Sequence, residues 1–206
     1  MLEIIKNLFV GNEEHYFNLK KEHIPGREVD QPCDNFAVVH ACKEPYHRQL
    51  LQYTGRGAPK DHPGYLFAER GNRLFMNIVD APKSLFFDKT MIDKAIDFME
   101  KKLDEGLKVL VHCNEGASRS PSISLLYLIK NGYIKGDTLE DCEVEFLKLY
   151  PNYNPGKGMR DFVKENFEFY KDLGKDIVHE VKKPKEVNKT KATKKVYTVE
   201  DKNVGE

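Results

Sequence analysis

The chain has 206 residues, 40% of them hydrophobic and 11% aromatic, which is enough for one domain with a full core. Its 33 Lys and Arg balance its 33 Asp and Glu, so overall charge does not favour a nucleic acid or a membrane surface as partner. The sequence has no apolar run of the roughly 18 residues that a membrane span needs. The four irregularly spaced Cys do not form a disulfide framework, and the N-terminus lacks a signal-peptide cleavage site, so we expect a reducing, cytoplasmic location.

The first half of the chain alternates apolar runs with turn residues. Residues 4–10 are predicted to form one strand that ends at Gly11, and residues 36–41 and 74–79 are predicted to form two buried strands. Residues 43–73, here called the basic segment, hold four Gly, three Pro and six Lys or Arg against three Asp or Glu. This composition predicts a loop-rich insertion that either lines the approach to a site and selects acidic or phosphorylated substrates, or is only a solvated insertion.

The second half is predicted to be mostly helical. Asp88 can cap a helix whose apolar residues follow the helical period until Gly106 stops it. A buried strand is predicted at 108–112, followed by three helices at 121–131, 138–150 and 159–173. Residues 174–206 are rich in Lys with isolated apolar residues, which predicts a disordered tail.

This order of elements predicts an α/β fold. Strands that alternate with helices favour a single domain over residues 1–173, with a mainly parallel central sheet flanked by helices. In such sheets ligands bind beyond the carboxyl ends of the strands. Cys113 directly follows the strand predicted at 108–112, so it is the first candidate for a functional residue.

Residues 113–119 (CNEGASR) join this strand to a helix. A tight loop at a helix N-terminus gathers backbone N–H groups into a nest that binds a phosphate, and Arg119 can hold two phosphate oxygens with its planar guanidinium. The same groups favour the thiolate of Cys113. Ser120 is predicted to be the N-cap of the helix and Pro121 a first-turn residue. The sequence therefore predicts attack of a Cys sulfur on phosphorus, without a metal.

The stretch VHCNEGASRSPS resembles the signature loop of the cysteine-based protein phosphatases, and specifically of their dual-specificity branch. That branch has His-Cys, two variable residues, Gly, one variable residue and Ser-Arg-Ser. The matching residues are His112, Cys113, Gly116, Ser118, Arg119 and Ser120. The similarity extends more weakly from residue 1 to about residue 170, and it covers the basic segment and the tail poorly.

The resemblance implies a general acid on a separate loop upstream of the Cys. Asp80, 33 positions before Cys113, would protonate the leaving oxygen and later deprotonate the attacking water. Asp88, 25 positions before Cys113, is the rival, but it is also the predicted helix cap. The resemblance further implies that Ser120 hydrogen-bonds the Cys113 sulfur and helps the thiolate leave.

The resemblance also implies roles for the rest of the loop. His112 would be buried and would orient the loop without transferring protons. The phosphate would be bound by the loop residues Asn114, Glu115, Gly116, Ala117, Ser118 and Arg119. Where the family has a Pro-Asn pair that braces the loop, this chain has Pro155 and Gly156, with Asn152 and Asn154 nearby, which leaves the bracing residue open.

The Cys residues allow two other uses. The spacing of Cys33, His40, Cys42 and His47 fits no standard zinc site, so no metal and no other cofactor is expected. Cys33 or Cys42 could instead form a reversible disulfide with Cys113 that protects it from over-oxidation. Cys142 falls on an apolar helix face and is predicted to be a core residue.

The chain is therefore predicted to be a metal-independent phosphomonoester hydrolase that acts on phosphotyrosine, and on phosphoserine or phosphothreonine, in a phosphoprotein partner. The alternatives are a nucleotide, RNA 5′-end or inositol-lipid phosphatase of the same superfamily, and a non-catalytic phosphate-binding module. Glu115 would repel a polyanionic substrate, which favours the phosphoprotein. A nucleic acid partner would have to use the basic tail. Sulfur transfer also uses a Cys loop, but it does not need Asp80.

Overall fold

The chain folds around a six-stranded mixed sheet. A computed structural model describes residues 1–21 and 35–177, so the predicted tail lies outside the described residues from residue 178 onward. The strands, in the order in which they lie side by side in the sheet, are β1 (Leu2–Ile5), β2 (Leu8–Gly11), β6 (Lys108–His112), β3 (Phe36–His40), β5 (Arg73–Met76) and β4 (Phe67–Arg70). The four central strands are parallel to one another, and β1 and β4 are antiparallel edges. The prediction of a mainly parallel sheet flanked by helices is confirmed.

Strand register aligns the carboxyl ends of the central strands. His112 at the end of β6 pairs with Gly11 at the end of β2 on one side and with His40 at the end of β3 on the other. His40 in turn pairs with Phe75 near the end of β5. The segments that leave these strands therefore start at one edge of the sheet, where a ligand site is expected in this class of fold.

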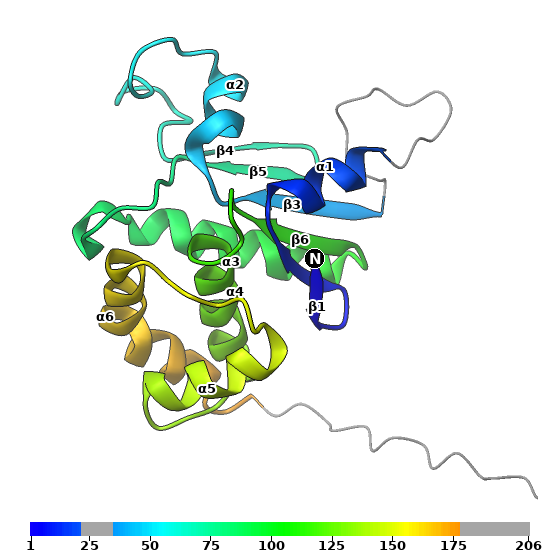
Figure 1. The fold of residues 1–206 in the computed structure, drawn as a ribbon, viewed down its shortest axis with the longest axis vertical. Helices are drawn as coiled ribbons and strands as arrows, with labels where there is room; N and C mark the ends of the chain where they lie inside the picture. Colours follow the sequence, from blue (N-terminus) through cyan, green and yellow to red (C-terminus); the bar gives the residue numbers. More distant parts are fainter. Residues whose placement is uncertain (22–34, 178–206) are drawn as a thin grey trace, which may run out of the picture.

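Helices cover both faces of the sheet. They are α1 (Glu13–Lys21), α2 (Arg48–Leu51), α3 (Lys89–Asp104), α4 (Arg119–Lys130), α5 (Leu139–Leu149) and α6 (Lys157–Gly174), with short turns η1 (Lys43–His47) and η2 (Ser84–Phe86). Figure 1 shows α3, α4, α5 and α6 on one side of the sheet and α1 on the other. Helix α4 is buried nearly all round because it contacts β6, α3, α5 and α6. Since α4 is the helix that follows Cys113, this packing fixes the position of its first turn beside the Cys113 loop.

The two ends of α3 follow the predicted signals, and a capping box begins α5. The Asp88 carboxylate accepts a hydrogen bond from the Thr90 backbone N–H at 2.8 Å and caps α3, as predicted. Gly106, just after α3, has a φ of 79°, in the left-handed region where Gly carries no Cβ penalty. Thr138 and Asp141 form a capping box at the start of α5.

The single strand predicted over residues 4–10 is wrong. The segment is a hairpin in which β1 and β2 are antiparallel, and the turn lies at Lys6 and Asn7. Asn7 has a φ of 67°, which Asn tolerates better than most residues, and its backbone N–H donates to the Glu3 carboxylate at 2.7 Å. An unbroken apolar run hides such a turn, because Asn is its only local signal.

The basic segment is also more ordered than predicted. It contains η1, α2 and strand β4, which extends the sheet at its edge beside β5. The start of β5 at Arg73 is one residue earlier than the predicted strand, and its end at Met76 is three residues earlier. No helix in the described part of the chain is long and apolar enough to cross a membrane.

Candidate active site

Cys113 lies at the carboxyl edge of the sheet, between β6 and α4. Its side chain is buried, with 1% of its surface exposed. The sulfur accepts two hydrogen bonds, from the Gly116 backbone N–H and from the Ser120 hydroxyl, each at 3.2 Å. Both donors stabilise negative charge on the sulfur, which is the nucleophilic form of Cys.

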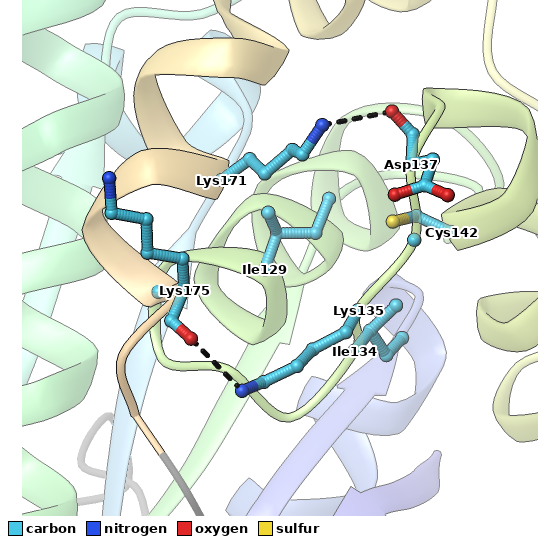
Figure 2. A pocket seen from close by; sticks show the side chains of 9 residues that line it. Ile129, Ile134, Lys135, Asp137, Cys142, Lys171 and Lys175 are labelled. Carbon is cyan, nitrogen blue, oxygen red and sulfur yellow. Dashed lines mark hydrogen bonds between the residues drawn. The ribbon is translucent and has the colours of Figure 1, made fainter.

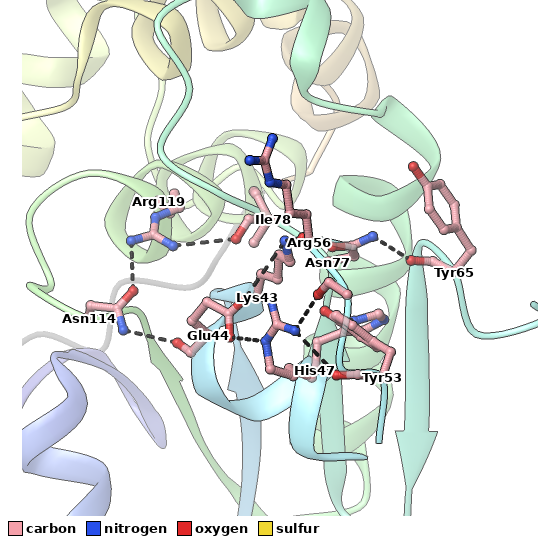
Figure 3. A network of polar contacts seen from close by, with 12 residues as sticks. Lys43, Glu44, His47, Tyr53, Arg56, Tyr65, Asn77, Ile78, Asn114 and Arg119 are labelled. Carbon is pink, nitrogen blue, oxygen red and sulfur yellow. Dashed lines mark hydrogen bonds and ion pairs between the residues drawn. The ribbon is translucent and has the colours of Figure 1, made fainter. Parts of the chain in front are cut away.

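Arg119 is the first residue of α4 and its guanidinium is buried against the same loop. Nη2 donates to the Asn114 side-chain oxygen at 2.9 Å, and Nη1 lies 3.4 Å from the Ile78 carbonyl (Figure 3). Its Nε is buried and has no hydrogen-bond partner among the described residues. A buried, unsatisfied cationic donor is costly. Its position beside Cys113 in the loop therefore fits an anion that would supply the missing acceptor.

The prediction that Ser120 caps α4 is wrong. The helix begins at Arg119 and its N-cap is Ser118, so Ser120 and Pro121 lie inside the first turn. The Ser120 hydroxyl, fully buried, instead lies 3.2 Å from both the Gly11 carbonyl and the Cys113 sulfur. Its contact with the sulfur is the one that the family resemblance implies.

The loop is braced from the segment between α5 and α6. The Tyr150 hydroxyl donates to the Gly116 carbonyl at 2.8 Å, and the Asn154 backbone N–H donates to the Ala117 carbonyl at 2.9 Å. The Gly156 backbone N–H donates to the Ser118 hydroxyl at 3.1 Å. The bracing that the sequence left open thus comes from backbone amides and one Tyr. Sequence reasoning missed Tyr150, which reads as an apolar residue at a helix end.

Gly116 must be Gly at its position in the loop. Its φ is 75°, and a Cβ there would lie 2.9 Å from the Gly11 carbonyl group. The loop therefore contacts the end of β2 as closely as backbone allows, which explains how Ser120 reaches Gly11. Asn114 is half-buried beside it, whereas the Glu115 side chain is exposed.

Asp80 lies next to this loop, after β5. Its carboxylate accepts a hydrogen bond from the Ser118 hydroxyl at 3.1 Å. Ser118 thus joins Asp80 to the Gly156 amide through one oxygen. Asp80 is exposed, so a leaving group and water can reach it. Asp88 has no such contact, because its carboxylate is used in the cap of α3.

His112 is fully buried beneath the loop. Its Nε2 lies 2.7 Å from Nδ1 of His40, its ring stacks on Tyr16 with centroids 5.0 Å apart, and its Nδ1 lies 3.4 Å from the Cys113 carbonyl. Burial, reinforced by the nearby charge of Arg119, lowers the pKa of His112 to about 3. The ring is therefore neutral near pH 7 and orients its surroundings instead of carrying a proton.

The remaining Cys and His candidates have other surroundings. His47 Nε2 lies 2.8 Å from the Gly64 carbonyl, and within residues 1–21 and 35–177 no three His, Cys, Asp or Glu side chains form a group that could hold a metal. Cys42 and Cys113 are free thiols, and burial raises the pKa of Cys42. Cys142 is buried in the core, as predicted. Cys33 lies outside the described residues.

A separate cavity of about 340 Å³ lies at the other end of α4. Figure 2 shows its lining, which includes Ile129, Ile134 and three Lys. Ile129 is ten residues along α4 from Arg119, a distance of about 15 Å at 1.5 Å per residue. Lys135 and Lys171 already donate to backbone carbonyls of the chain itself. This cavity takes no part in the site around Cys113.

A Cys loop of this kind, at the carboxyl edge of a mainly parallel sheet, places the molecule in the cysteine-based phosphatase class of folds. Residues 72–175 match the model of the dual specificity phosphatase catalytic domain. The chain belongs to this family.

Curated relatives match shorter stretches. Dual specificity protein phosphatase 5 of Rattus norvegicus is 57% identical over 37 residues, which cover 18% of this chain and 10% of that protein. Dual specificity protein phosphatase 1 of Mus musculus is 35% identical over 81 residues, which cover 39% of this chain and 18% of that protein. The matches thus span less than a fifth of the length of these relatives.

Solved structures share the fold. The human tyrosine phosphatase-like serine/threonine/tyrosine-interacting protein superposes with a TM-score of 0.54 at 20% identity, covering 82% of this chain and 97% of that one. A leucine rich repeat and phosphatase domain containing protein from Entamoeba histolytica gives a TM-score of 0.51 at 16% identity, covering 82% of this chain and 93% of that one.

Proposed function

We propose that the protein is a metal-independent phosphomonoester hydrolase that removes phosphate from phosphotyrosine, and from phosphoserine or phosphothreonine, in proteins. The observation that carries this proposal is the buried Nε of Arg119, which lacks an acceptor in the same loop as the Cys113 sulfur. A phosphate oxygen bound there would accept the hydrogen bond that Nε lacks. The sulfur in the same loop is then available for attack on the phosphorus.

In the first step the Cys113 sulfur attacks phosphorus, an S–P bond forms, and the P–O bond to the leaving oxygen breaks. Asp80 gives its proton to that oxygen. In the second step water attacks the cysteinyl-phosphate and Asp80 takes a proton from it, while the S–P bond breaks. The Ser120 hydroxyl, 3.2 Å from the sulfur, stabilises the thiolate as it leaves. Arg119 and the loop amides stabilise the charge on the phosphoryl oxygens in both steps.

A phosphoprotein is the favoured substrate because the loop adds no cation of its own besides Arg119. Asn114, Glu115 and Ala117 occupy the variable positions, and the exposed Glu115 would repel a polyanion such as an inositol polyphosphate or an RNA triphosphate. The nucleophile must remain a free thiol, which agrees with a reducing compartment such as the cytoplasm.

The test is activity against a panel of phosphotyrosine peptide, phosphothreonine peptide, inositol phosphates and RNA triphosphate. Cys113→Ser should lose more than about 100-fold in kcat, about 3 kcal/mol, because a hydroxyl is far less ionised than a thiol. Cys142→Ser, a buried Cys outside the site, is the matched control and should keep activity. Turnover should persist in EDTA and stop with vanadate.

Each alternative has its own outcome. Phosphate binding by the wild type without turnover would assign the protein to the non-catalytic binding modules. Faster hydrolysis of inositol phosphates or RNA would replace the phosphoprotein as substrate. A Cys113→Ser variant with near wild-type kcat would end the covalent mechanism.

A further inference from the structure

The loop of residues 53–56 in the basic segment is held in place by two cations. Arg48 Nη1 donates to the Tyr53 carbonyl at 3.2 Å and to the Gly55 carbonyl at 2.6 Å. Lys43 Nζ donates to the Arg56 carbonyl at 2.5 Å. Arg48 is itself fixed by the Glu44 carboxylate, which accepts from its Nε and its Nη2 at 2.7 Å each. The loop backbone is therefore anchored from one side (Figure 3).

The same residues attach this loop to residues 113–119, which are here called the phosphate loop after their proposed role. The Lys43 backbone N–H donates at 2.8 Å to the Ile78 carbonyl, which is the carbonyl that Arg119 Nη1 contacts. The Asn114 side-chain N–H donates to the Glu44 carbonyl at 3.1 Å, while its oxygen accepts from Arg119. Lys43 thus links the two loops: its side chain binds the Arg56 carbonyl, and its backbone N–H binds the Ile78 carbonyl that Arg119 also contacts.

The charge of the Arg56 guanidinium is not compensated. Among the carboxylates of the basic segment, Glu44 is paired with Arg48 and Glu69 with Lys94 at 2.9 Å. The third, Asp61, forms no ion pair with Arg56. Arg56 is exposed and has no side-chain hydrogen bond or ion pair among the described residues. Figure 3 shows its side chain extending away from the contacts that anchor its backbone. An anchored backbone with a free guanidinium is a position that can receive an anion from outside the chain.

We propose that Arg56 is the cation of a second anion-binding position beside the phosphate loop, which takes an acidic or phosphorylated side chain of the substrate peptide. This inference rests on the proposed function and narrows its substrate class to peptides with a negative charge near the phosphorylated residue. An extended peptide advances about 3.3 Å per residue, so we expect the anionic side chain to lie within a few residues of the phosphorylated one. The family match begins at residue 72, so this position belongs to the part of the chain before that match.

The experiment compares three phosphotyrosine peptides that differ only in a neighbouring residue, which is Gln, Glu or phosphothreonine. Arg56→Ala should lower kcat/KM for the two anionic peptides by about fivefold, the upper range for an exposed ion pair. It should leave kcat/KM for the Gln peptide and for a small aryl phosphate unchanged. A larger loss for phosphothreonine than for Glu would identify a phosphate as the preferred group. Arg56→Lys should restore part of the difference.

Lys60→Ala is the matched control, because Lys60 is exposed in the same segment and carries the same charge. Equal losses for Arg56→Ala and Lys60→Ala, or equal losses on all three peptides, would overturn the proposal. Binding of labelled peptides to wild type and Arg56→Ala, followed by fluorescence anisotropy, gives a readout that does not need turnover. Without turnover the proposed function fails, and the anion-binding position is then decided by whether the two anionic peptides bind Arg56→Ala more weakly.

Discussion

The Arg119 guanidinium uses two of its nitrogens for contacts within the protein and leaves the third, Nε, without an acceptor among the described residues. Nη2 and Nη1 contact Asn114 and the Ile78 carbonyl, which fix the plane of the group. A fixed plane means that little side-chain entropy is lost when an anion binds. Lys has one ammonium group instead of a planar guanidinium, so it could not keep both contacts and also present two parallel donors to an anion. We therefore expect that a positive charge alone cannot replace Arg119.

Asp80→Asn should test the proposed role of Asp80 as the general acid. On a phosphate ester with a poor leaving group, kcat should fall by about 100-fold or more, because the leaving oxygen no longer receives a proton. On an aryl phosphate whose leaving group needs no proton, the loss should be much smaller. Steady-state kinetics on the two substrates check this difference.

Asp88→Asn is the control for this prediction, because Asn also caps helices and Asp88 has no contact with the loop. It should change neither rate. Equal losses of Asp80→Asn on both substrates would show that Asp80 is not the acid.

At the residue level, much of the candidate site follows from one stretch of sequence. Cys113, Gly116 and Arg119 lie together because a strand, a tight loop and a helix are contiguous, so short-range signals suffice. The cap was misplaced by two residues because both Ser118 and Ser120 are good capping residues. The contact of Ser120 with Gly11 depends on the pairing of β2 with β6, and a sequence motif contains no such information.

At the level of elements, the phosphate loop depends on the connection between α5 and α6. Three successive loop residues, 116 to 118, each receive one hydrogen bond from this connection. Gly158 at the start of α6 allows it to lie against the backbone at Ala81 and Lys83, where a Cβ would collide. The start of α6 therefore contacts both the loop of Asp80 and, through Gly156, the loop of Cys113.

Tyr150→Phe should loosen the loop without unfolding the protein. It removes the hydroxyl that donates to the Gly116 carbonyl and leaves a buried acceptor unsatisfied. We expect a loss of roughly tenfold in kcat/KM, equivalent to about 1.4 kcal/mol, and weaker binding of orthophosphate.

Tyr153→Phe removes a hydroxyl from the same connection, but that hydroxyl donates to Glu143 and not to the loop. It should therefore keep kcat/KM. Similar losses in the two variants, or none in Tyr150→Phe, would contradict the bracing role of Tyr150.

Elements were predictable where their pattern was periodic. Helices α3, α5 and α6 and strands β3, β5 and β6 follow apolar periods and capping residues, so their positions could be predicted to within a few residues. The edge elements could not. The turn between β1 and β2 has no Gly, and β4 is half-exposed within a segment whose composition is that of a loop. Pairing with β5 stabilises β4, and that pairing is a tertiary effect.

At the level of the whole molecule, buried neutral His residues make stability depend on pH. Burial lowers the pKa of His112 to about 3 and also lowers that of His47. The unfolded chain binds protons at His below about pH 6.5, whereas in the folded chain these two rings take up a proton only at lower pH. Since the unfolded state then holds more protons, stability is complete above this pH and falls as the solution becomes more acidic.

The free energy of unfolding should thus decrease between pH 6.5 and 5, by up to about 1.4 kcal/mol per pH unit from His112, and His47 contributes in the same direction. Urea titrations across this range measure the slope, and this window lies above the range in which most carboxylates titrate. His47→Gln should make the slope smaller, because the contribution of His47 is then removed. A free energy that is constant from pH 6.5 to 5 would show that these rings are already charged in the folded protein.

The bracing of the phosphate loop also sets the order in which the site can form during synthesis. A ribosome releases the chain from its N-terminus, so Cys113 and the strands of the sheet emerge before residues 150–156. A nascent chain that ends at Lys130 has the nucleophile and α4 but none of the hydrogen bonds that Tyr150, Asn154 and Gly156 supply. The loop therefore gains these hydrogen bonds only after the connection to α6 has left the ribosome. Until then the Cys113 thiol lies in a loop without them.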